Sequence, residues 1–546
     1  MRLLLAALLA SLILAACAAI FPPPAPASAS QPAAPGLTAG LDLLAQSPPR
    51  IVASALARPV AQHLAQPIGR PVARPIDRPS ARLDLLAGSR STWQDGWLLV
   101  HLEGTPYQLG YQRGYLTSKL SAQWVRSCLG PSGPARTRLR RIAARFIWPK
   151  VPAEYRQEMR GIAAGMRARG NKADVWDVVA ANAWADLYVY RSSAARSLTS
   201  AAEGTASLSG RSTASSGTVI DSASSPLAAG PTGAGHCSAF IATGSATRDH
   251  RIVMGHTTWA GYGDSFTDRV IFDMKPASGH SFRYQGAPAA IWSGEDWYVN
   301  DTGLMICETS FEDSPVNPRG VPLFVRIREA VQYASSIDDV VRTLRRHNNG
   351  AYPNEWLIGD AKTDEIASLQ LGCRASDLKR TSSGFYGSSN WPTGRNWLRE
   401  TPWDSPSWAN GEYDRYMRWR DLRDRWWGRI DAQAGETMLA DHRDYYLDRT
   451  QASSRTICGH FEAETEVRGD TIPYGSIDGK VITSTMALSG MQMLARWGHP
   501  CGAVFQAGRF LRTHPAWARS HDSFTVAGLR AFDRATPQPW TLVSSF

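Results

Sequence analysis

The 546-residue sequence has few cysteines and lacks the common nucleotide-binding and metal-binding motifs. Seven cysteines in so long a chain do not make a disulfide scaffold, and no pair of them has zinc-site spacing. Gly-x-Gly-x-x-Gly after a strand, the P-loop, His-Glu-x-x-His and Gly-x-Ser-x-Gly are also missing. These absences argue against nucleotide-dependent enzymes, zinc peptidases and serine esterases. We expect neither a metal nor an organic cofactor.

The apolar run at the start, residues 3–16, is too short to cross a bilayer as a stable helix. Arg2 precedes it, and it ends in Leu14-Ala15-Ala16-Cys17, which resembles a lipobox. Residues 1–17 are therefore predicted to be a bacterial lipoprotein signal. Acyl chains on Cys17 would hold the exported protein on the periplasmic or cell-surface face of a membrane. The alternative is an ordinary signal with an Ala-x-Ala-like cut, in which Cys17 has no role.

Residues 18–90 lack helical or strand periodicity and are rich in proline and arginine, which predicts a disordered tether. Between positions 50 and 82 this segment holds six arginines and one acidic residue, Asp77, so it carries nearly half of the net charge of +11. It could lie against anionic lipid headgroups or simply be a solvated linker. No aromatic residues alternate with these arginines, so we do not expect nucleic acid binding.

Residues 91–546 are long enough for one large hydrolase domain, and their predicted strands and helices occur in an order typical of an α+β protein. The first part, 91–191, predicts a strand at 97–102 and helices at 152–169 and 175–190. Residues 192–236 are rich in Ser, Ala, Gly and Thr and are predicted to form a flexible, processed insert. The part from 237 to 546 predicts short strands and a few helices. Its expected elements are strands 238–243, 251–256, 269–274, 281–284, 298–308, 356–359, 365–371 and 481–486, and helices 324–346 and 412–429.

Cys237 begins a strand-like segment directly after this insert. That position is typical of an enzyme that cuts itself, here between His236 and Cys237, to make cysteine a new N-terminus. Such a residue carries both a thiol nucleophile and an α-amine, and an α-amine titrates near pH 8. The alternative is a buried structural thiol, because free cysteine packs like a small apolar side chain.

Several short motifs occur in one order over roughly 400 residues, and together they resemble one family. They are 104–114 (Gly-Thr-Pro-Tyr-x-x-Gly-Tyr-Gln-x-Gly), 236–239 (His-Cys-Ser-Ala), 255–259 (Gly-His-Thr-Thr-Trp), 303–309 (Gly-Leu-x-x-x-Glu-Thr), 456–460 (Thr-Ile-Cys-Gly-His) and 477–481 (Ile-Asp-Gly-Lys-Val). The chain resembles the phospholipase B-like proteins and the penicillin acyltransferase-type enzymes, which are self-cleaving N-terminal nucleophile hydrolases. The signal, the tether and much of the insert lie outside the resemblance.

The resemblance implies an αββα sandwich, with two antiparallel sheets between helical layers and Cys237 at the start of a central strand. It also implies a cysteine hydrolase that acts on an acyl ester or a linear amide. The partner would be an acyl lipid or a small acyl-amide substrate. An amidase or acyltransferase, or a non-catalytic surface binding protein that retains the fold, are the alternatives. The sequence leaves open the oligomeric state and any disulfides among Cys128, Cys307, Cys373, Cys458 and Cys501.

The other candidate site residues are polar or aromatic positions near the matching motifs. A hairpin could return His256 to Cys237, where it would orient or polarise the thiol or the substrate. Asn390, Asn300 and Arg455 are candidate donors to an oxyanion. For these three the competing roles are turn formation at the two asparagines and a surface charge at Arg455. Two further residues are candidates for substrate binding: Trp259 and Thr309.

Overall fold

The computed structural model of the chain describes residues 84–187, 237–263, 265–311, 314–401, 411–464 and 471–544. All of them belong to one compact unit. The predicted signal with Cys17, the tether up to residue 83 and the insert 192–236 with His236 lie outside the described residues, so these remain predictions. Among the helices of the described ranges, none combines the length and the apolar character needed to cross a membrane.

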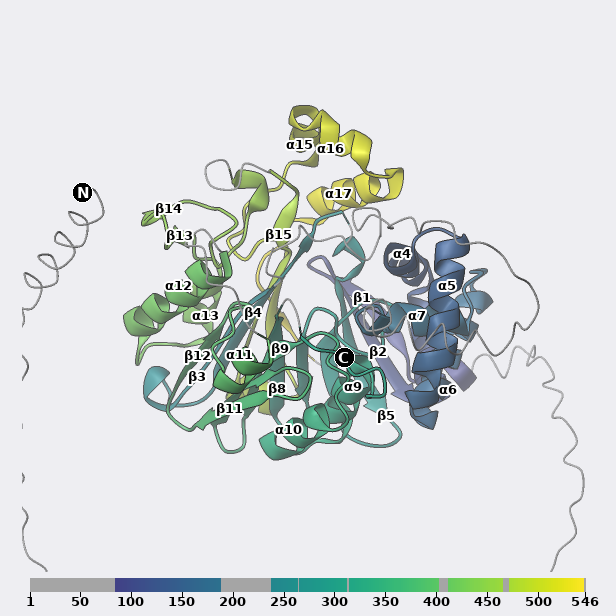
Figure 1. Cartoon of the computed structure of the whole chain (residues 1–546), viewed down its shortest axis with the longest axis horizontal. Coiled ribbons are helices and arrows are strands. Elements are labelled where there is room, and N and C mark those ends of the chain that lie inside the picture. The colour runs from purple at the N-terminus through teal and green to yellow at the C-terminus, as the bar shows by residue number, and fades with distance from the viewer. Residues whose placement is uncertain are drawn as a thin grey trace, which may run out of the picture. The chain divides into compact units, whose positions relative to one another are not determined.

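Two large sheets form the centre of the molecule (Figure 1). The first has nine strands, in the order β1 (Arg90–Gln94), β2 (Trp97–Gly104), β5 (Val270–Pro276), β6 (Phe282–Gln285), β7 (Trp297–Asn300), β8 (Leu304–Ser310), β9 (Asn354–Asp360), β10 (Glu365–Leu371) and β11 (Ser376–Thr381). Its neighbouring strands are antiparallel except for the parallel pair β2 and β5.

The second sheet contains the predicted nucleophile. Its order is β12 (Gly384–Ser388), β3 (Cys237–Thr243), β4 (Val253–Gly261), β16 (Asp478–Thr483), β17 (Met493–Trp497) and β18 (Thr541–Val543), and β15 (Tyr474–Ser476) also pairs with β4. All of these pairs are antiparallel. β3 and β4 form the hairpin that the sequence predicts.

The two sheets pack face to face through a buried apolar core to which both contribute, for example Met305 and Leu357 from the first sheet and Ile241 and Met254 from the second. Helices cover the two outer faces (Figure 1). On the first sheet lie α3 (Pro106–Leu116), α4 (Ser118–Leu129), α5 (Pro134–Ile142), α6 (Ala153–Ala168), α7 (Val175–Asn182), α9 (Leu323–Tyr333) and α10 (Ile337–Arg345). On the second lie α12 (Gly411–Trp426) and α13 (Ala432–Leu439). The predicted α+β sandwich with helix–sheet–sheet–helix layers is confirmed.

The glycines of the first motif let α3 and α6 cross with their backbones in contact. A Cβ at Gly110 would lie 1.9 Å from the carbonyl oxygen of Glu158, and one at Gly114 would lie 2.1 Å from that of Ile162. Thr105 caps α3 in a capping box with Gln108. This motif therefore builds helix packing and contributes no side chain to the nucleophile.

Four predicted elements differ from the structure. The strand predicted at 298–308 is divided into β7 and β8 by a turn at residues 301–303. The helix predicted at 324–346 is divided into α9 and α10, because Ser336 accepts a hydrogen bond from the Asp339 N–H and starts a new helix. The strand predicted at 481–486 ends at Thr483, which caps the short helix α14 (Ser484–Leu488). The helix predicted at 175–190 ends at Asn182.

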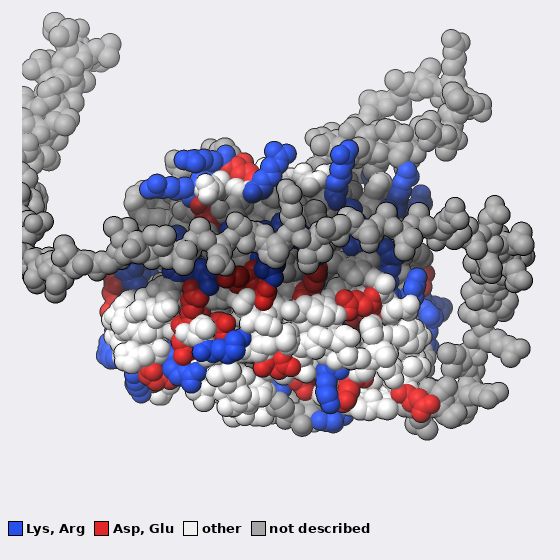
Figure 2. Space-filling model, turned by 90° about the horizontal axis from the view of Figure 1, so that it is seen from below, with Lys and Arg blue, Asp and Glu red and all other residues white. Residues whose placement is uncertain are grey.

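Acidic and basic side chains are interspersed on the face of the folded part that Figure 2 shows. Charged side chains of the described residues also form ion pairs, such as Arg380 with Glu365 at 2.7 Å. The net positive charge of the sequence therefore does not form one basic patch on this face. This agrees with the assignment of much of the positive charge to residues 50–82.

Candidate active site

Cys237 is the first residue of β3 and is buried, with 2 % of its surface exposed. It pairs with Thr258 of β4, and Ala239 pairs with His256. Directly paired residues in an antiparallel sheet present their side chains on one face. Because Ala239 and Ile241 belong to the core between the sheets, Cys237 and His256 also face this inter-sheet layer.

Asn390 and Arg415 hold the backbone on both sides of the Cys237 side chain. The Cys237 N–H donates to Oδ1 of Asn390 at 3.3 Å. Arg415 Nη1 donates to the Cys237 carbonyl oxygen at 2.6 Å and to the hydroxyl oxygen of Ser238 at 2.9 Å. Both terminal nitrogens of Arg415 also lie 3.1 Å from Oδ1 of Asn390. Because Oδ1 of Asn390 accepts from the Cys237 N–H and from both terminal nitrogens of Arg415, the orientation of the Asn390 amide is fixed.

The local backbone explains why asparagine stands at position 390. Its φ is 68°, in the left-handed region that asparagine tolerates better than most side chains. One N–H of its amide donates to the Ser310 carbonyl oxygen at 2.7 Å, and its backbone N–H donates to Oγ1 of Thr309 at 3.3 Å. The side-chain amide carries two N–H groups, so this bond to Ser310 uses one of its two donors. Thr309 therefore supports Asn390, and a contact of its own with substrate stays a prediction.

Two buried carboxyl groups, those of Asp296 and Glu308, lie close to the Cys237 thiol. Burial raises the pKa of Glu308 to about 7. Burial and the neighbouring Glu308 carboxyl raise the pKa of Asp296 well above its ordinary value. Tyr352 donates its hydroxyl to Oδ2 of Asp296 at 3.1 Å. Two adjacent buried carboxyls cannot both ionise readily, so the pair retains a proton near neutral pH.

The same surroundings keep the thiol protonated. Burial, followed by the charges of Asp296 and Glu308, raises the pKa of Cys237 well above its ordinary value, although a backbone hydrogen bond from Trp259 opposes this shift. The thiolate is the reactive form of cysteine. Cys237 therefore needs a base to act as a nucleophile, because the electrostatic environment of the site does not lower the pKa of its thiol.

His256 is buried and neutral. Burial, followed by the positive charge of Lys480, lowers its pKa well below the ordinary value of 6.5. Its Nε2 lies 3.0 Å from the Glu308 carbonyl oxygen, so Nε2 carries the proton and donates it. Nδ1 is then an acceptor, and it is buried without a hydrogen-bond partner among the described residues. Such an atom can accept a proton or hold a polar group of a ligand.

Trp259 is buried beside the nucleophile, on the strand that pairs with β3. The guanidinium carbon of Arg415 lies 4.1 Å from the centre of its ring, a cation–π contact. On another side, Gly459 is so close that a Cβ there would lie 2.3 Å from the ring. Trp259 thus fixes the position of Arg415, and its predicted contact with substrate stays untested.

The structure does not place Asn300 among the groups around Cys237. Its amide nitrogen donates to the carbonyl oxygens of Val331 and Ala334, at 3.1 and 3.0 Å. Its Oδ1 accepts from Thr302 and Leu304 in the turn between β7 and β8. Both ends of the side chain are committed to tying this turn to the end of α9. The turn role weighed for Asn300 is correct, and the oxyanion role is not supported.

Arg455 is neither an oxyanion donor nor a surface charge. It is completely buried and pairs with Asp444 at 2.5 Å, Glu464 at 2.8 Å and Asp414 at 3.5 Å. Three carboxyl groups around one guanidinium form a buried ionic centre that joins α12 to the loop before β15. Its role is structural, because a charge removed from water must be matched by partners.

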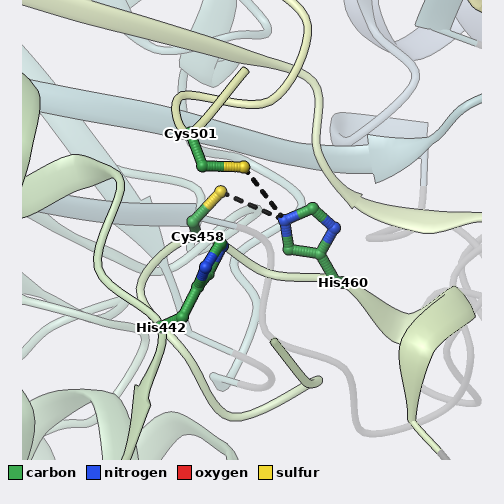
Figure 3. A group of neighbouring side chains, drawn as sticks. All are labelled: His442, Cys458, His460 and Cys501. Atoms are coloured by element: carbon green, nitrogen blue, oxygen red, sulfur yellow. Dashed lines mark hydrogen bonds between the residues drawn. The ribbon is translucent and has the colours of Figure 1, made fainter. Parts of the chain in front are cut away.

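Sequence reasoning missed Arg415. It lies in the predicted helix 412–429 among many other arginines, and nothing in their spacing distinguishes it. A second group that the sequence did not reveal consists of His442, Cys458, His460 and Cys501, whose donor atoms lie within 4.8 Å of one another and could hold a metal ion (Figure 3). No disulfide joins any two of the six cysteines among the described residues.

Comparison with known proteins confirms the resemblance to phospholipase B-like proteins. The phospholipase B family model matches residues 135–371, a range that includes Cys237, His256 and Thr309 but ends before Asn390. The chain is 30 % identical over 137 residues to putative phospholipase B-like 1 of Caenorhabditis elegans, covering 24 % of each chain. It is 29 % identical over 148 residues to putative phospholipase B-like 2 of Rattus norvegicus, covering 24 % of this chain and 25 % of the relative.

Two further similarities are to an uncharacterised protein and to a solved structure. An uncharacterised protein of Archaeoglobus fulgidus is 26 % identical over 290 residues, which are 51 % of this chain and 43 % of the relative. Penicillin V acylase from Agrobacterium tumefaciens aligns in structure over 48 % of this chain and 83 % of its own, with 10 % identity and a TM-score of 0.26. The matches thus span under half of the archaeal relative and about a quarter of the two phospholipase B-like proteins.

Proposed function

We propose that the protein is an acyl hydrolase of the phospholipase B-like kind, with Cys237 as its nucleophile. The observation that carries the proposal is the set of contacts around this one residue. Its backbone N–H donates to Asn390, and its carbonyl oxygen accepts from Arg415. Its side chain faces the inter-sheet layer that holds His256 and the acid pair, Asp296 and Glu308. A structural cysteine needs no such arrangement of its backbone.

The proposed cycle has two stages. In the precursor the thiol attacks the carbonyl carbon of His236, the peptide nitrogen of Cys237 leaves as an amine, and water hydrolyses the resulting thioester. The free α-amine of Cys237 then accepts the thiol proton, directly or through one water. The raised pKa of the thiol means that it needs a base. The α-amine can serve as this base, because it titrates near pH 8 and is partly unprotonated at neutral pH.

In the second stage the thiolate attacks the carbonyl carbon of an acyl substrate. The tetrahedral oxyanion would accept hydrogen bonds from the second N–H of Asn390 and from backbone N–H groups. The leaving group departs with a proton from the α-ammonium, and water releases the acyl group from Cys237. His256 would orient the substrate through Nδ1, its unpartnered acceptor.

For the substrate we propose the acyl ester of a phospholipid. Support comes from the relatives that carry the phospholipase B-like name and from the lipid anchor proposed at Cys17, which would keep the enzyme beside its substrate. An amidase or acyltransferase acting on a small N-acyl substrate would use the same groups. The third candidate is a non-catalytic surface protein.

The deciding experiment is N-terminal sequencing of the purified protein together with acyl turnover. We expect two fragments, one of them starting at Cys237, that stay associated under native conditions, and a single uncut chain from Cys237→Ala. Wild-type protein that is uncut yet active would overturn the self-cleavage. Uncut and inactive protein would favour the binding-protein alternative. Release of fatty acid from phospholipid vesicles, compared with release from N-acyl amino acids, separates ester from amide substrates.

Localisation is tested separately. We propose an exported protein anchored through Cys17, so Cys17→Ser should move it from the membrane fraction to the soluble fraction. A soluble wild-type protein whose N-terminus lies beyond residue 17 would contradict the anchor without touching the proposed chemistry.

A further inference from the structure

Four side chains that the proposed function does not use converge on one point. They are His442, which directly precedes β13 (Arg443–Asp444), Cys458 and His460 in the loop before β15, and Cys501, which follows β17. One donor atom from each lies within 4.8 Å of the other three. Figure 3 shows the two sulfur atoms and the two imidazole rings turned toward one another. All four residues lie outside the range of the family match.

The distances in this group fit a tetrahedral metal site. Nε2 of His460 lies 3.3 Å from the sulfur of Cys458 and 3.5 Å from the sulfur of Cys501. With Zn–S near 2.3 Å and Zn–N near 2.0 Å, tetrahedral angles place sulfur and nitrogen ligands about 3.5 Å apart. Donors this close surround a single ion and leave no room for a two-iron cluster.

Hydrogen bonding determines which nitrogen of His460 is available. Its Nδ1 lies 2.8 Å from Oε1 of Glu462, so Nδ1 carries the proton and donates it. Oε2 of the same carboxylate accepts the hydroxyl of Tyr262 at 2.7 Å. Nε2 therefore carries no proton, and its lone pair faces the two sulfur atoms. A carboxylate behind a histidine in this way is the usual outer support of a zinc ligand, because it fixes the ring and its tautomer.

Hydrogen bonds alone do not account for the group. One lone pair can accept only one S–H, yet both sulfur atoms lie against Nε2 of His460. The Ala503 N–H lies 3.3 Å from the sulfur of Cys501, in position to donate to a thiolate. Nε2 of His442 is buried and has no hydrogen-bond partner among the described residues. A cation at the centre would satisfy all of these atoms together.

We propose that His442, Cys458, His460 and Cys501 bind one zinc ion in a closed structural site. Two thiolates and two imidazoles form a Cys₂His₂ set, which selects zinc over magnesium or calcium. Four protein ligands leave no open position for water, so the ion holds structure and takes no part in catalysis. A disulfide between Cys458 and Cys501 is the competing arrangement, but it gives no role to the two histidines.

The position of the site suggests what it stabilises. Gly459, between two of the ligands, packs against the Trp259 ring, and its N–H donates to Oγ of Ser476 at 3.0 Å. The Trp259 ring supports Arg415, which binds the Cys237 carbonyl. The ion would thus fix the loop behind the nucleophile from a position that no substrate needs to reach.

Metal analysis of the purified full-length protein tests the proposal independently of activity. We expect about one zinc per chain, and X-ray absorption at the zinc edge should show two sulfur and two nitrogen ligands. Cys501→Ser and His442→Ala should each reduce bound zinc by about fivefold or more. Cys128→Ser, which changes a cysteine outside the group, is the matched control and should retain the zinc.

Three results would overturn the proposal. One is zinc-free protein with a Cys458–Cys501 disulfide found by peptide mapping without reductant. Another is zinc whose X-ray absorption shows no sulfur ligand. The third is full zinc content in both variants. If a variant does not fold, the absorption spectrum of wild-type protein still decides. None of these measurements depends on self-cleavage or on acyl turnover.

Discussion

The side-chain oxygen of Asn390 lies 3.3 Å from the backbone nitrogen of Cys237, although 153 residues separate the two positions in the chain. This nitrogen is the atom that cleavage would convert into the α-amine. Asn390 therefore already holds the proposed base of the enzyme. In the proposed mechanism the oxygen of its amide would position the amine, and the second amide N–H would donate to a substrate oxyanion.

Cys237→Ser should cut itself partly but turn over substrate far more slowly than wild type. A thiol gives up its proton to the α-amine far more readily than a hydroxyl does, because its ordinary pKa is much lower. Rates of acyl release and the ratio of cut to uncut chain on denaturing gels measure the two effects. Cys307→Ser, at a buried cysteine of the core between the sheets, is the control and should retain activity. Equal turnover by Cys237→Ser and wild type would remove Cys237 as the nucleophile.

Asn390→Asp should lower kcat by about a hundredfold, the scale of one lost oxyanion donor, with little change in KM. Aspartate keeps the oxygen that meets Cys237 and Arg415 and tolerates the left-handed backbone, but its carboxylate has no N–H. Asn390→Ala should show a similar loss of kcat and, because alanine is strained at this φ, a lower Tm. Steady-state kinetics that show a change in KM alone would contradict the oxyanion role.

Arg415 and Arg455 should respond in opposite ways to substitution. Arg415→Lys keeps the charge but loses the planar fork that reaches Cys237 and Asn390, so kcat should fall by about tenfold or more. Arg455→Met leaves three buried carboxyl groups without their cation and should lower the free energy of unfolding by about 3–5 kcal/mol. Denaturant titration and kinetics of both variants test this. A stable Arg455→Met protein that has lost only kcat would restore Arg455 as a catalytic candidate.

His256→Gln should lower turnover by a factor that does not change between about pH 5.5 and 8. Because the pKa of His256 lies well below 6.5 in the folded protein, the ring stays neutral as the pH falls through 6.5. The ratio of kcat/KM between wild type and variant, measured across this range, gives the result. The fragment pattern should stay that of wild type. A ratio that falls with an apparent pKa near 6.5 would show that His256 titrates there after all.

The acid pair should make stability fall as the pH rises. Burial raises the pKa of Glu308 from 4.5 to about 7, so the folded state binds the extra proton between these values. The stability this gives is fully present below pH 4.5 and is lost as the pH rises through 7, on the order of 1–3 kcal/mol. Urea unfolding of the uncut Cys237→Ala chain at about pH 5 and 8 measures the difference. Glu308→Gln in the same background should reduce it; an unchanged difference would assign it to other groups.

Local patterns predicted the elements of this fold well. The strand at 97–102, the β3–β4 hairpin and the β9–β10 hairpin all follow from short apolar segments between turn residues. The helix predicted at 412–429 corresponds to α12. The errors fall where a single polar side chain ends one element and starts another, as Ser336 and Thr483 do, because periodicity cannot resolve a cap within an apolar stretch.

The sequence by itself determined the layered α+β fold, the position of Cys237 at the start of a strand and its hairpin relation to His256, since each depends on residues close together in the chain. Only the tertiary structure decided that Arg415 and Asn390 meet Cys237, that Arg455 serves a buried ionic centre, and that His442, Cys458, His460 and Cys501 converge. These groups come from segments up to 178 residues apart. Their meeting depends on strand register and on the packing of layers, which no local pattern encodes.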